Sequence, residues 1–421
     1  MSAYVINGGQ RLVGETDVQG AKNSALPILA ATLLCNGKSE IHNCPDLSDI
    51  DATANILRHL GCSVSRSGSV ITVDSSQVDA NEIPDELMRE MRSSVIFLGA
   101  ILARTGRVSL STPGGCEIGL RPIDLHLDAM KKLGAEVSDE FGHICCESRS
   151  GLRGAKISLS FPSVGATENI MIAASTAQGV TTIVNAAREP EISDLADFLN
   201  SCGARISGAG EGTITIDGVE RLSGAVHSVI PDRIAAATIM AAAAMTHGRV
   251  CLNKIIPAHL GPVIDVFEEA GCRINTYGRS ILIEAPSRLK AIKTIRTMPY
   301  PGFPTDIQAP VVAMLSIARG TSVVIETIFE SRYKYIGELV RMGAKIRVDG
   351  RIAVVEGVDE FHGVPVITPD LRGGAALVIA GLAAKGQTEI SEIKHIDRGY
   401  EKLEQTLQKL SADIKRVDDN E

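Results

Sequence analysis

Tryptophan is absent from this chain, and aromatic residues make up only 3% of it. The core must therefore be built from aliphatic side chains. Long hydrophobic runs are also missing: the longest, residues 234–245, is mostly alanine and too short to span a bilayer. The first ten residues lack the basic-then-apolar pattern of a signal peptide. We therefore expect a cytoplasmic protein with no membrane insertion.

Metal-binding patterns are lacking as well. The nine cysteines are an odd, scattered set, with no CxxC pair and no His/Cys cluster at zinc spacing. We expect reduced thiols and neither a metal nor another cofactor. The net charge of −8 argues against a nucleic-acid surface, although it permits a local basic pocket. The sequence does not indicate any protein partner.

What the chain does contain is a repeat. With 421 residues it exceeds one ordinary core, so two domains are expected. An amphipathic helix that ends near a pair of small residues and is followed by a strand recurs at a spacing of about 70 residues. The turn residues of the six copies are Gly61, Gly134, Gly203, Gly271, Gly343 and Ser411.

A second pattern alternates with the first. An apolar helix ends near a glycine, and a short strand follows, which suits a left-handed helix cap. These helices are apolar nearly all round and should be buried. The six segments span residues 26–43, 94–110, 169–185, 234–253, 311–327 and 375–392.

Six repeats fit an α/β protein of two pseudo-symmetric domains with three repeats each. Apolar helices would fill each domain and strands would face solvent. We expect residues 22–230 to form the first domain, and residues 1–21 with 231–421 to form the second. The N-terminal segment is expected to form a strand pair that completes the second domain. The chain would then cross twice between the domains, and the cleft beside such a hinge is the natural ligand site.

Charged and polar residues at the expected helix starts are the first candidates for function. A helix N-terminus attracts anions through free backbone N–H groups and the helix dipole. Each residue alone also fits a simple cap or a solvated charge. The candidates are Lys22, Asn23, Arg92, Ser163, Val164, Gly165, Asp306, Asp370 and Arg372.

Loop residues give a second set. Arg121, Arg332 and Arg398 could be surface ion pairs of little energetic value, or guanidinium groups that bind phosphate and carboxylate. Cys116 lies in a Gly-Gly loop without apolar periodicity, unlike the other eight cysteines, which we interpret as packing residues. Nearby cations would lower its pKa, so that it could donate a proton or act as a nucleophile. His126 is more readily a ligand contact or a surface residue than its partner base.

These stretches resemble the enolpyruvyl transferases over essentially the whole chain. The resemblance rests on "GAKNSALPIL", "PGGCEIGLRPIDLH", "SVGATEN", "NAAREPEI", "PDRI", "FPTDIQA", "DLRGGAA" and "HIDRGYE". It implies two inside-out α/β barrel domains with three repeats each, in agreement with the repeats described above.

The resemblance also implies a reaction. Phosphoenolpyruvate would donate its enolpyruvyl group to the 3-hydroxyl of UDP-N-acetylglucosamine, with release of phosphate, in the first committed step of peptidoglycan synthesis. Addition would precede elimination, and fixed cations would hold the phosphate without a metal.

Roles follow from the resemblance position by position. Cys116 would be the proton donor and the site captured by phosphoenolpyruvate or by fosfomycin, and Asp306 would deprotonate the sugar hydroxyl. Asp370 would help move protons. The substrate contacts fall into four groups: Lys22, Arg121 and Arg398 on phosphate; Arg332 and Arg372 on the carboxylate; Asn23, Arg92 and Ile328 on the sugar; Arg121, Pro122, Ile123, Asp124, Leu125, Ser163, Val164 and Gly165 on uridine and diphosphate.

Four positions depart from the family pattern. Phe161 and Ile96 stand where some members carry a lysine and an aromatic residue near the nucleotide and the sugar. Ala235 and Gly373 replace a common acidic residue and a common alanine, which bears on the packing of the second domain.

Two alternatives remain. One is the sister transferase that acts on shikimate 3-phosphate, although "AKNSA" and the loop cysteine speak against it. The other is a catalytically silent relative that binds a UDP-sugar, although Cys116, Asp306 and Arg398 are all present.

Overall fold

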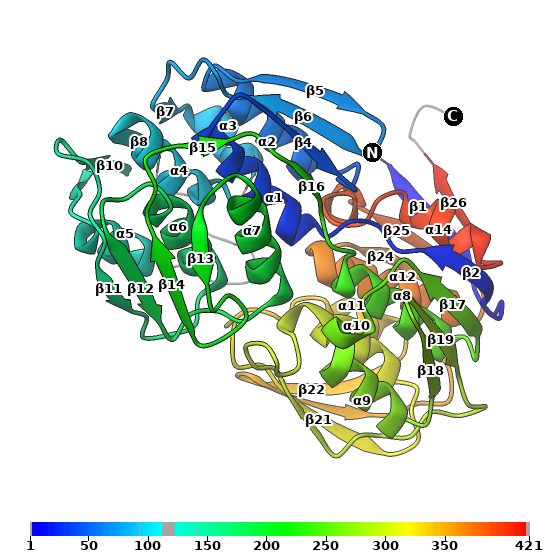
Figure 1. Ribbon diagram of the computed structural model, residues 1–421. Helices are drawn as coiled ribbons and strands as arrows, with labels where there is room; N and C mark the ends of the chain where they lie inside the picture. Colours follow the sequence, from blue (N-terminus) through cyan, green and yellow to red (C-terminus); the bar gives the residue numbers. More distant parts are fainter. Residues whose placement is uncertain (1, 92, 112–122, 141, 418–421) are drawn as a thin grey trace. The chain divides into compact units, whose positions relative to one another are not determined.

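A computed structural model describes residues 2–91, 93–111, 123–140 and 142–417 of the chain (Figure 1). The described residues fall into two compact units. One unit holds residues 2–19 and 231–417, and the other holds residues 20–111 and 123–230. The first, built from both ends of the chain, is the split unit, and the second is the continuous unit. Each has its own cluster of buried aliphatic side chains.

One strand pattern recurs in the six four-stranded sheets of the described residues. An edge strand runs parallel to its neighbour, and the next two strands are antiparallel. In the continuous unit the sheets are β16(Val226–Ser228)-β4(Lys38–His42)-β6(Val70–Asp74)-β5(Ser63–Ser67), β7(Glu82–Ile83)-β8(Arg107–Ser111)-β10(His143–Glu147)-β9(Glu136–Glu140) and β11(Lys156–Ser158)-β12(Val180–Val184)-β14(Thr213–Asp217)-β13(Arg205–Ser207). A two-stranded sheet pairs β15(Leu222–Ser223) with β3(Cys35–Asn36).

The split unit repeats the pattern with strands from both ends of the chain. Its sheets are β2(Val13–Asp17)-β17(Arg249–Asn253)-β19(Ser280–Glu284)-β18(Arg273–Tyr277), β20(Thr294–Arg296)-β21(Thr321–Ile325)-β23(Ile352–Glu356)-β22(Lys345–Asp349) and β24(Pro365–Ile367)-β25(Gln387–Ser391)-β1(Ala3–Asn7)-β26(Asp413–Val417).

The N-terminal segment contributes to this unit in a way that the sequence did not indicate. Strands β1 and β2 do not pair with each other, so the expected strand pair is wrong. Each joins a different sheet, β1 between β25 and β26, and β2 beside β17. Both strands still complete sheets of the split unit.

The apolar helices lie in the core, as their composition predicts. In the split unit, α8(Arg233–Met245), α10(Thr305–Leu315) and α12(Leu371–Ala383) pack against one another. In the continuous unit, α4(Phe97–Thr105) packs against both α1(Lys22–Ala31) and α6(Val164–Ala174). Nearly all residues of these helices are buried, because helices in which Ala, Ile, Leu, Met and Val predominate have no broad polar face to present to water.

The helices of the other repeat pattern bury one face only. They are α2(Ser48–His59), α5(Asp124–Lys132), α7(Pro190–Ser201), α9(Gly261–Glu269), α11(Ile336–Arg341) and α14(Leu403–Lys409). Short helices complete the described structure: α3(Asp85–Glu90), α13(Lys394–Asp397), η1(Thr32–Leu34), η2(Ser94–Ile96) and η3(Pro257–Leu260). Among the helices of these residues, none is long and apolar enough to cross a membrane.

The turn residues of the repeat adopt the left-handed backbone conformation that they predict. All six have positive φ, from 72° at Ser411 to 107° at Gly343. A left-handed glycine was expected after each apolar helix, and after α8 this expectation is wrong. His247 (φ 53°), and not Gly248, takes the left-handed conformation there. Gly248 serves close packing instead, because a Cβ on it would lie 2.5 Å from the carbonyl oxygen of Leu12.

Candidate functional site

The carboxylate of Asp306 lies between two buried arginines in the split unit. Asp306 is in the first turn of α10, and its two oxygens accept hydrogen bonds from different guanidinium groups. Arg332 Nη2 is 2.6 Å from Oδ1, and Arg372 Nη2 is 3.1 Å from Oδ2. Both arginine side chains are 4% exposed and that of Asp306 is 26% exposed. The predicted base and the predicted carboxylate ligands are therefore neighbours.

The guanidinium of Arg372 stays charged in this setting. Burial acts to lower its pKa, but Asp306, Tyr400 and Asp232 act in the opposite direction, and the net result is a raised pKa. The ring of Tyr400 lies against the guanidinium, 5.4 Å from ring centre to Cζ. A permanently charged, largely desolvated cation is a strong partner for a substrate carboxylate or phosphate.

Asp370 is the N-cap of α12, and its Oδ1 accepts hydrogen bonds from the backbone N–H groups of Arg372 and Gly373. Among the described residues, three buried polar atoms of Asp370 and the two arginines have no hydrogen-bond partner. They are Asp370 Oδ2, Arg332 Nε and Arg372 Nη1. Buried polar atoms of this kind are rare in native structures, and they are one sign of a functional site.

Glu326 connects the Asp306 region with Ile328. One carboxylate oxygen of Glu326 accepts hydrogen bonds from the backbone N–H groups of Ile328 and Phe329 and from Thr297 Oγ1. The other accepts a hydrogen bond from Thr305 Oγ1, at 2.9 Å. Thr305 directly precedes Asp306. The hydrogen bonds of Glu326 therefore link the backbone of Ile328, the predicted sugar contact, to the residue next to Asp306, the predicted base.

Arg398 follows the short helix α13, and the next two residues are held tightly. Gly399 packs on Leu371, since a Cβ added to the glycine would lie 2.8 Å from both methyl carbons of that leucine. The hydroxyl of Tyr400 is hydrogen-bonded to Thr238 Oγ1 of α8, at 2.9 Å. Arg398 is therefore attached to a segment that packs on the first residue of α12.

Lys22 and Asn23 start helix α1 in the continuous unit, as expected. Lys22 is buried, and its ammonium group is 2.9 Å from Asp49 Oδ2 of α2. This pairing rules out a fully solvated lysine. Asn23 is exposed, so its amide is accessible to a ligand.

The starts of α5 and α6 lie side by side in the same unit. Ser163 is the N-cap of α6, with its Oγ accepting a hydrogen bond from the N–H of Ala166. Gly165 approaches His126 of α5 so closely that a Cβ would be 3.2 Å from the imidazole ring. Asp124 is exposed, and Ile123, Leu125 and Val164 are half-buried. The two predicted nucleotide-binding segments thus meet at a helix N-terminus, which favours an anion.

His126 is a buried residue, which corrects the interpretation of it as a surface residue. It is buried, and its Nδ1 is 2.8 Å from Asn169 Nδ2. Burial lowers the pKa of His126 to about 4, so the imidazole is neutral at pH 7.

Four predicted site residues lie outside the described residues: Arg92, Cys116, Arg121 and Pro122. Of the other eight cysteines, Cys145 and Cys251 are only partly buried, so packing does not explain all of them. No group of three His, Cys, Asp or Glu side chains suited to a metal occurs within the described ranges.

The four departures from the family pattern differ in their surroundings. Phe161 is 43% exposed, whereas Ile96 and Ala235 are buried in the two cores. At Gly373, a Cβ would lie 2.8 Å from the Cβ of Tyr335. The glycine therefore makes room for a fully buried tyrosine.

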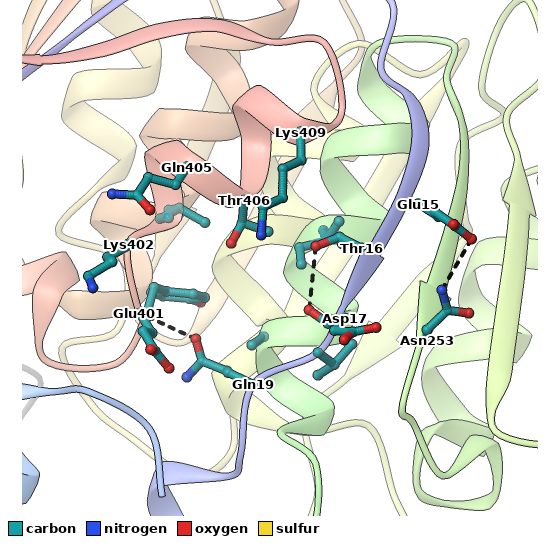
Figure 2. A pocket seen from close by; sticks show the side chains of 15 residues that line it. Glu15, Thr16, Asp17, Gln19, Asn253, Glu401, Lys402, Gln405, Thr406 and Lys409 are labelled. Atoms are coloured by element: carbon teal, nitrogen blue, oxygen red, sulfur yellow. Dashed lines mark hydrogen bonds between the residues drawn. The ribbon is translucent and has the colours of Figure 1, made fainter. Parts of the chain in front are cut away.

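A separate cavity of about 420 Å³ lies in the split unit, between strand β2 and helix α14 (Figure 2). Polar side chains of both signs line it, and Ala235, Ile239 and Leu403 give it an apolar part. Its lining includes Tyr400 and Gln19, but none of the predicted site residues.

Sequence reasoning missed several residues that hold the site together. Asp49 lies in helix α2, Glu326 directly follows strand β21, and Gln19 lies two residues after strand β2; none of the three belongs to a motif. Their role depends on contacts between segments distant in sequence. Asp49 is 2% exposed. The signal available for it was an acidic residue at a helix position that faces the core, since a buried charge needs a partner.

The comparisons with known proteins define the class first. The family model described as EPSP synthase (3-phosphoshikimate 1-carboxyvinyltransferase) matches residues 6–407. The chain therefore belongs to this family of carboxyvinyltransferases, which confirms the resemblance found in the sequence.

Close relatives narrow the comparison. The chain is 55% identical to UDP-N-acetylglucosamine 1-carboxyvinyltransferase 2 of Caldanaerobacter subterraneus subsp. tengcongensis, over 99% of this chain and 100% of that protein. It is 50% identical to UDP-N-acetylglucosamine 1-carboxyvinyltransferase 1 of Symbiobacterium thermophilum, over 98% of this chain and 95% of the relative.

Solved structures agree on the fold. The enolpyruvyl transferase NikO from Streptomyces tendae aligns with a TM-score of 0.89 at 25% identity, over 99% of both chains. An EPSP synthase from Acinetobacter baumannii aligns with a TM-score of 0.75 at 18% identity, over 99% of this chain and 100% of that one. The fold described above, in which helices pack with mixed parallel and antiparallel sheets, is thus the fold of enolpyruvyl transferases.

Proposed function

We propose that this protein transfers the enolpyruvyl group of phosphoenolpyruvate to the 3-hydroxyl of UDP-N-acetylglucosamine and releases phosphate. The observation that carries the proposal is the near-full-length identity of 46–55% to relatives named for this reaction. The reaction is the committed step of peptidoglycan synthesis, so the proposal includes a cytoplasmic location and a role in cell shape and division.

The fold and domains belong to the same proposal. Three sheets with central apolar helices in each unit fit an inside-out α/β barrel of three repeats. The proposed domains are residues 22–230, and residues 1–21 with 231–421. The proposal requires candidate residues of both to reach the same pair of substrates.

The proposed mechanism begins at phosphoenolpyruvate. Cys116 protonates the methylene carbon, and the sugar hydroxyl adds at the neighbouring carbon as Asp306 takes its proton. The tetrahedral adduct then loses a proton from the new methyl group, and its C–O bond to phosphate breaks. The products are the vinyl ether and inorganic phosphate. Asp370 assists proton movement in the elimination.

Asp306 needs an exposed, ionised carboxylate for this role. Arg332 and Arg372 stabilise the ionised form, and their pairing also restrains it. A substrate carboxylate that binds the same two guanidinium groups would compete with Asp306 for them. Binding of phosphoenolpyruvate would thereby release the base at the moment it is needed. The unpartnered Nε of Arg332 and Nη1 of Arg372 are the groups that would donate hydrogen bonds to the new anion.

The remaining contacts are proposed by group. Lys22, Arg121 and Arg398 hold the phosphate, and Arg332 and Arg372 hold the carboxylate. Asn23, Arg92 and Ile328 contact the sugar. The uridine and diphosphate are bound by residues 121–125 and 163–165, where the N-terminus of α6 supplies unpaired N–H groups.

Phosphate release with alternative acceptors tests the proposal. The protein and phosphoenolpyruvate are incubated with UDP-N-acetylglucosamine or with shikimate 3-phosphate, with and without fosfomycin. Release with the UDP-sugar alone, blocked by the epoxide, is expected. Release only with shikimate 3-phosphate would assign the chain to the sister reaction. Release with neither, combined with retained UDP-sugar binding, would support the silent relative.

A further inference from the structure

The side chain of Gln19 is bound to the backbone on both sides of Tyr400. Its Nε2 donates a hydrogen bond to the carbonyl oxygen of Gly399, at 3.1 Å. Its Oε1 accepts a hydrogen bond from the N–H of Glu401, at 2.8 Å, which is drawn in Figure 2. One primary amide therefore satisfies a donor and an acceptor of the segment that begins at Arg398.

Further contacts attach this segment to α8 and α12 of the split unit. Gly399 packs on Leu371, the Tyr400 hydroxyl is bonded to Thr238, and the Tyr400 ring lies against Arg372. These contacts hold one face of the segment against α8 and α12. The Gln19 amide holds the backbone itself, including the carbonyl of the residue directly after Arg398. This backbone carries Arg398 and sets the position from which its side chain extends.

The chemistry of the contact requires a glutamine. A carboxylate of the same shape would accept from Glu401 N–H but would place a negative oxygen against the Gly399 carbonyl. Alanine would remove both bonds. The backbone carbonyl of Gln19 separately accepts a hydrogen bond from Asp232 N–H, at 2.8 Å, and a side-chain substitution leaves this bond in place.

We propose that Gln19 is a positioning residue for phosphate binding, which acts by fixing the backbone that carries Arg398. The inference rests on the proposed function, because it uses the assignment of Arg398 to the phosphate of phosphoenolpyruvate. Gln19 does not touch substrate. It lies in the N-terminal segment of the split unit, about 380 residues away from Arg398 along the chain.

Steady-state kinetics of the full-length protein test this inference. Gln19→Ala and Gln19→Glu are each compared with wild type, and phosphate release is measured while each substrate is varied in turn. Gln405→Ala is the matched control, because Gln405 is an exposed glutamine of α14 that lines the same cavity (Figure 2). The KM for phosphoenolpyruvate should rise about tenfold in both Gln19 variants, because alanine removes both hydrogen bonds, whereas glutamate removes the one to Gly399 and places a negative oxygen against that carbonyl. The KM for UDP-N-acetylglucosamine should stay within about twofold of wild type.

A double-mutant cycle with Arg398→Lys locates the effect. If Gln19 acts through Arg398, Gln19→Ala should raise the KM for phosphoenolpyruvate by much less in the Arg398→Lys background than in wild type. Equal increases in both backgrounds would overturn the inference. So would equal rises in both substrates' KM values, or a Gln19→Glu variant that behaves like wild type. Absence of phosphate release by the wild type with any acceptor would instead refute the proposed function.

Discussion

Replacing Glu168 by glutamine should stabilise the protein at alkaline pH and leave it unchanged at acidic pH. Glu168 lies on the buried helix α6, one turn after Val164, and is 6% exposed. Burial raises the pKa of this carboxyl to about 8, and the charges of Glu191 and Glu189 add to the effect. Its ordinary value is 4.5. The folded protein therefore binds the Glu168 proton more tightly than the unfolded chain does.

The sign of the pH dependence follows from this difference. The protonated carboxyl favours the folded state fully below pH 4.5, and the benefit is lost as the pH rises through about 8. The difference in pKa corresponds to roughly 3–5 kcal/mol at most. Glutamine has no charge to lose. Glu168→Gln should thus raise the free energy of unfolding by about that amount at pH 8.5.

Urea unfolding followed by circular dichroism measures the effect, at pH 5 and at pH 8.5. The midpoint of the transition of the variant should exceed that of wild type at pH 8.5 and approach it at pH 5. Glu404→Gln is the control, because Glu404 is equally buried but accepts a hydrogen bond from the Tyr4 hydroxyl. It should not stabilise the protein at alkaline pH. The same midpoint shift for Glu168→Gln at both pH values would refute the reasoning.

Three further substitutions test the site and the core. Cys116→Ser should lower the rate of phosphate release by about a hundredfold or more, because a hydroxyl is a far weaker acid than a thiol; a near-normal rate at pH 8 would count against the thiol as proton donor. Asp306→Ala should lower kcat by at least about a hundredfold while UDP-sugar binding, measured by calorimetry, changes little; equal losses in both would contradict a base role. Gly373→Ala should lower the free energy of unfolding by about 1–3 kcal/mol in urea titrations, since the added Cβ meets that of Tyr335 at 2.8 Å; an unchanged midpoint would show that the tyrosine moves at no cost.

Most of the fold could be predicted from local patterns in the sequence. The alternation of all-apolar and amphipathic helices predicted which helices are buried, and the turn residues from Gly61 to Ser411 predicted left-handed backbone. Pairing over long distances was harder to predict. Strand β1 lies between β25 and β26, nearly 400 residues later in the chain, and no periodicity encodes such a partner.

In the candidate site, too, residues in local motifs could be predicted and residues that act through long-range contacts could not. Asp306, Arg332 and Arg372 could be named from the sequence, and the structure brings them together. Their supporting residues could not. Glu326 is bonded to the side chains of Thr297 and Thr305, and Gln19 to the backbone of Gly399 and Glu401; all four partners lie in other segments, so these bonds depend on the tertiary structure. The left-handed conformation falls on His247 rather than Gly248 for a similar reason. Gly248 packs closely against Leu12, which requires a residue without a side chain.

The measurement that tests the central proposal most directly is analysis of the product formed in D₂O. The protein is incubated with phosphoenolpyruvate and UDP-N-acetylglucosamine, and phosphate and the nucleotide product are quantified together by mass spectrometry and NMR. Equal amounts of phosphate and of a 3-enolpyruvyl ether, with deuterium in its vinyl group, are expected, because addition passes through a methyl group that takes its new hydrogen from solvent. Phosphate without the ether would contradict the transfer, and an ether free of deuterium would contradict protonation of the methylene carbon.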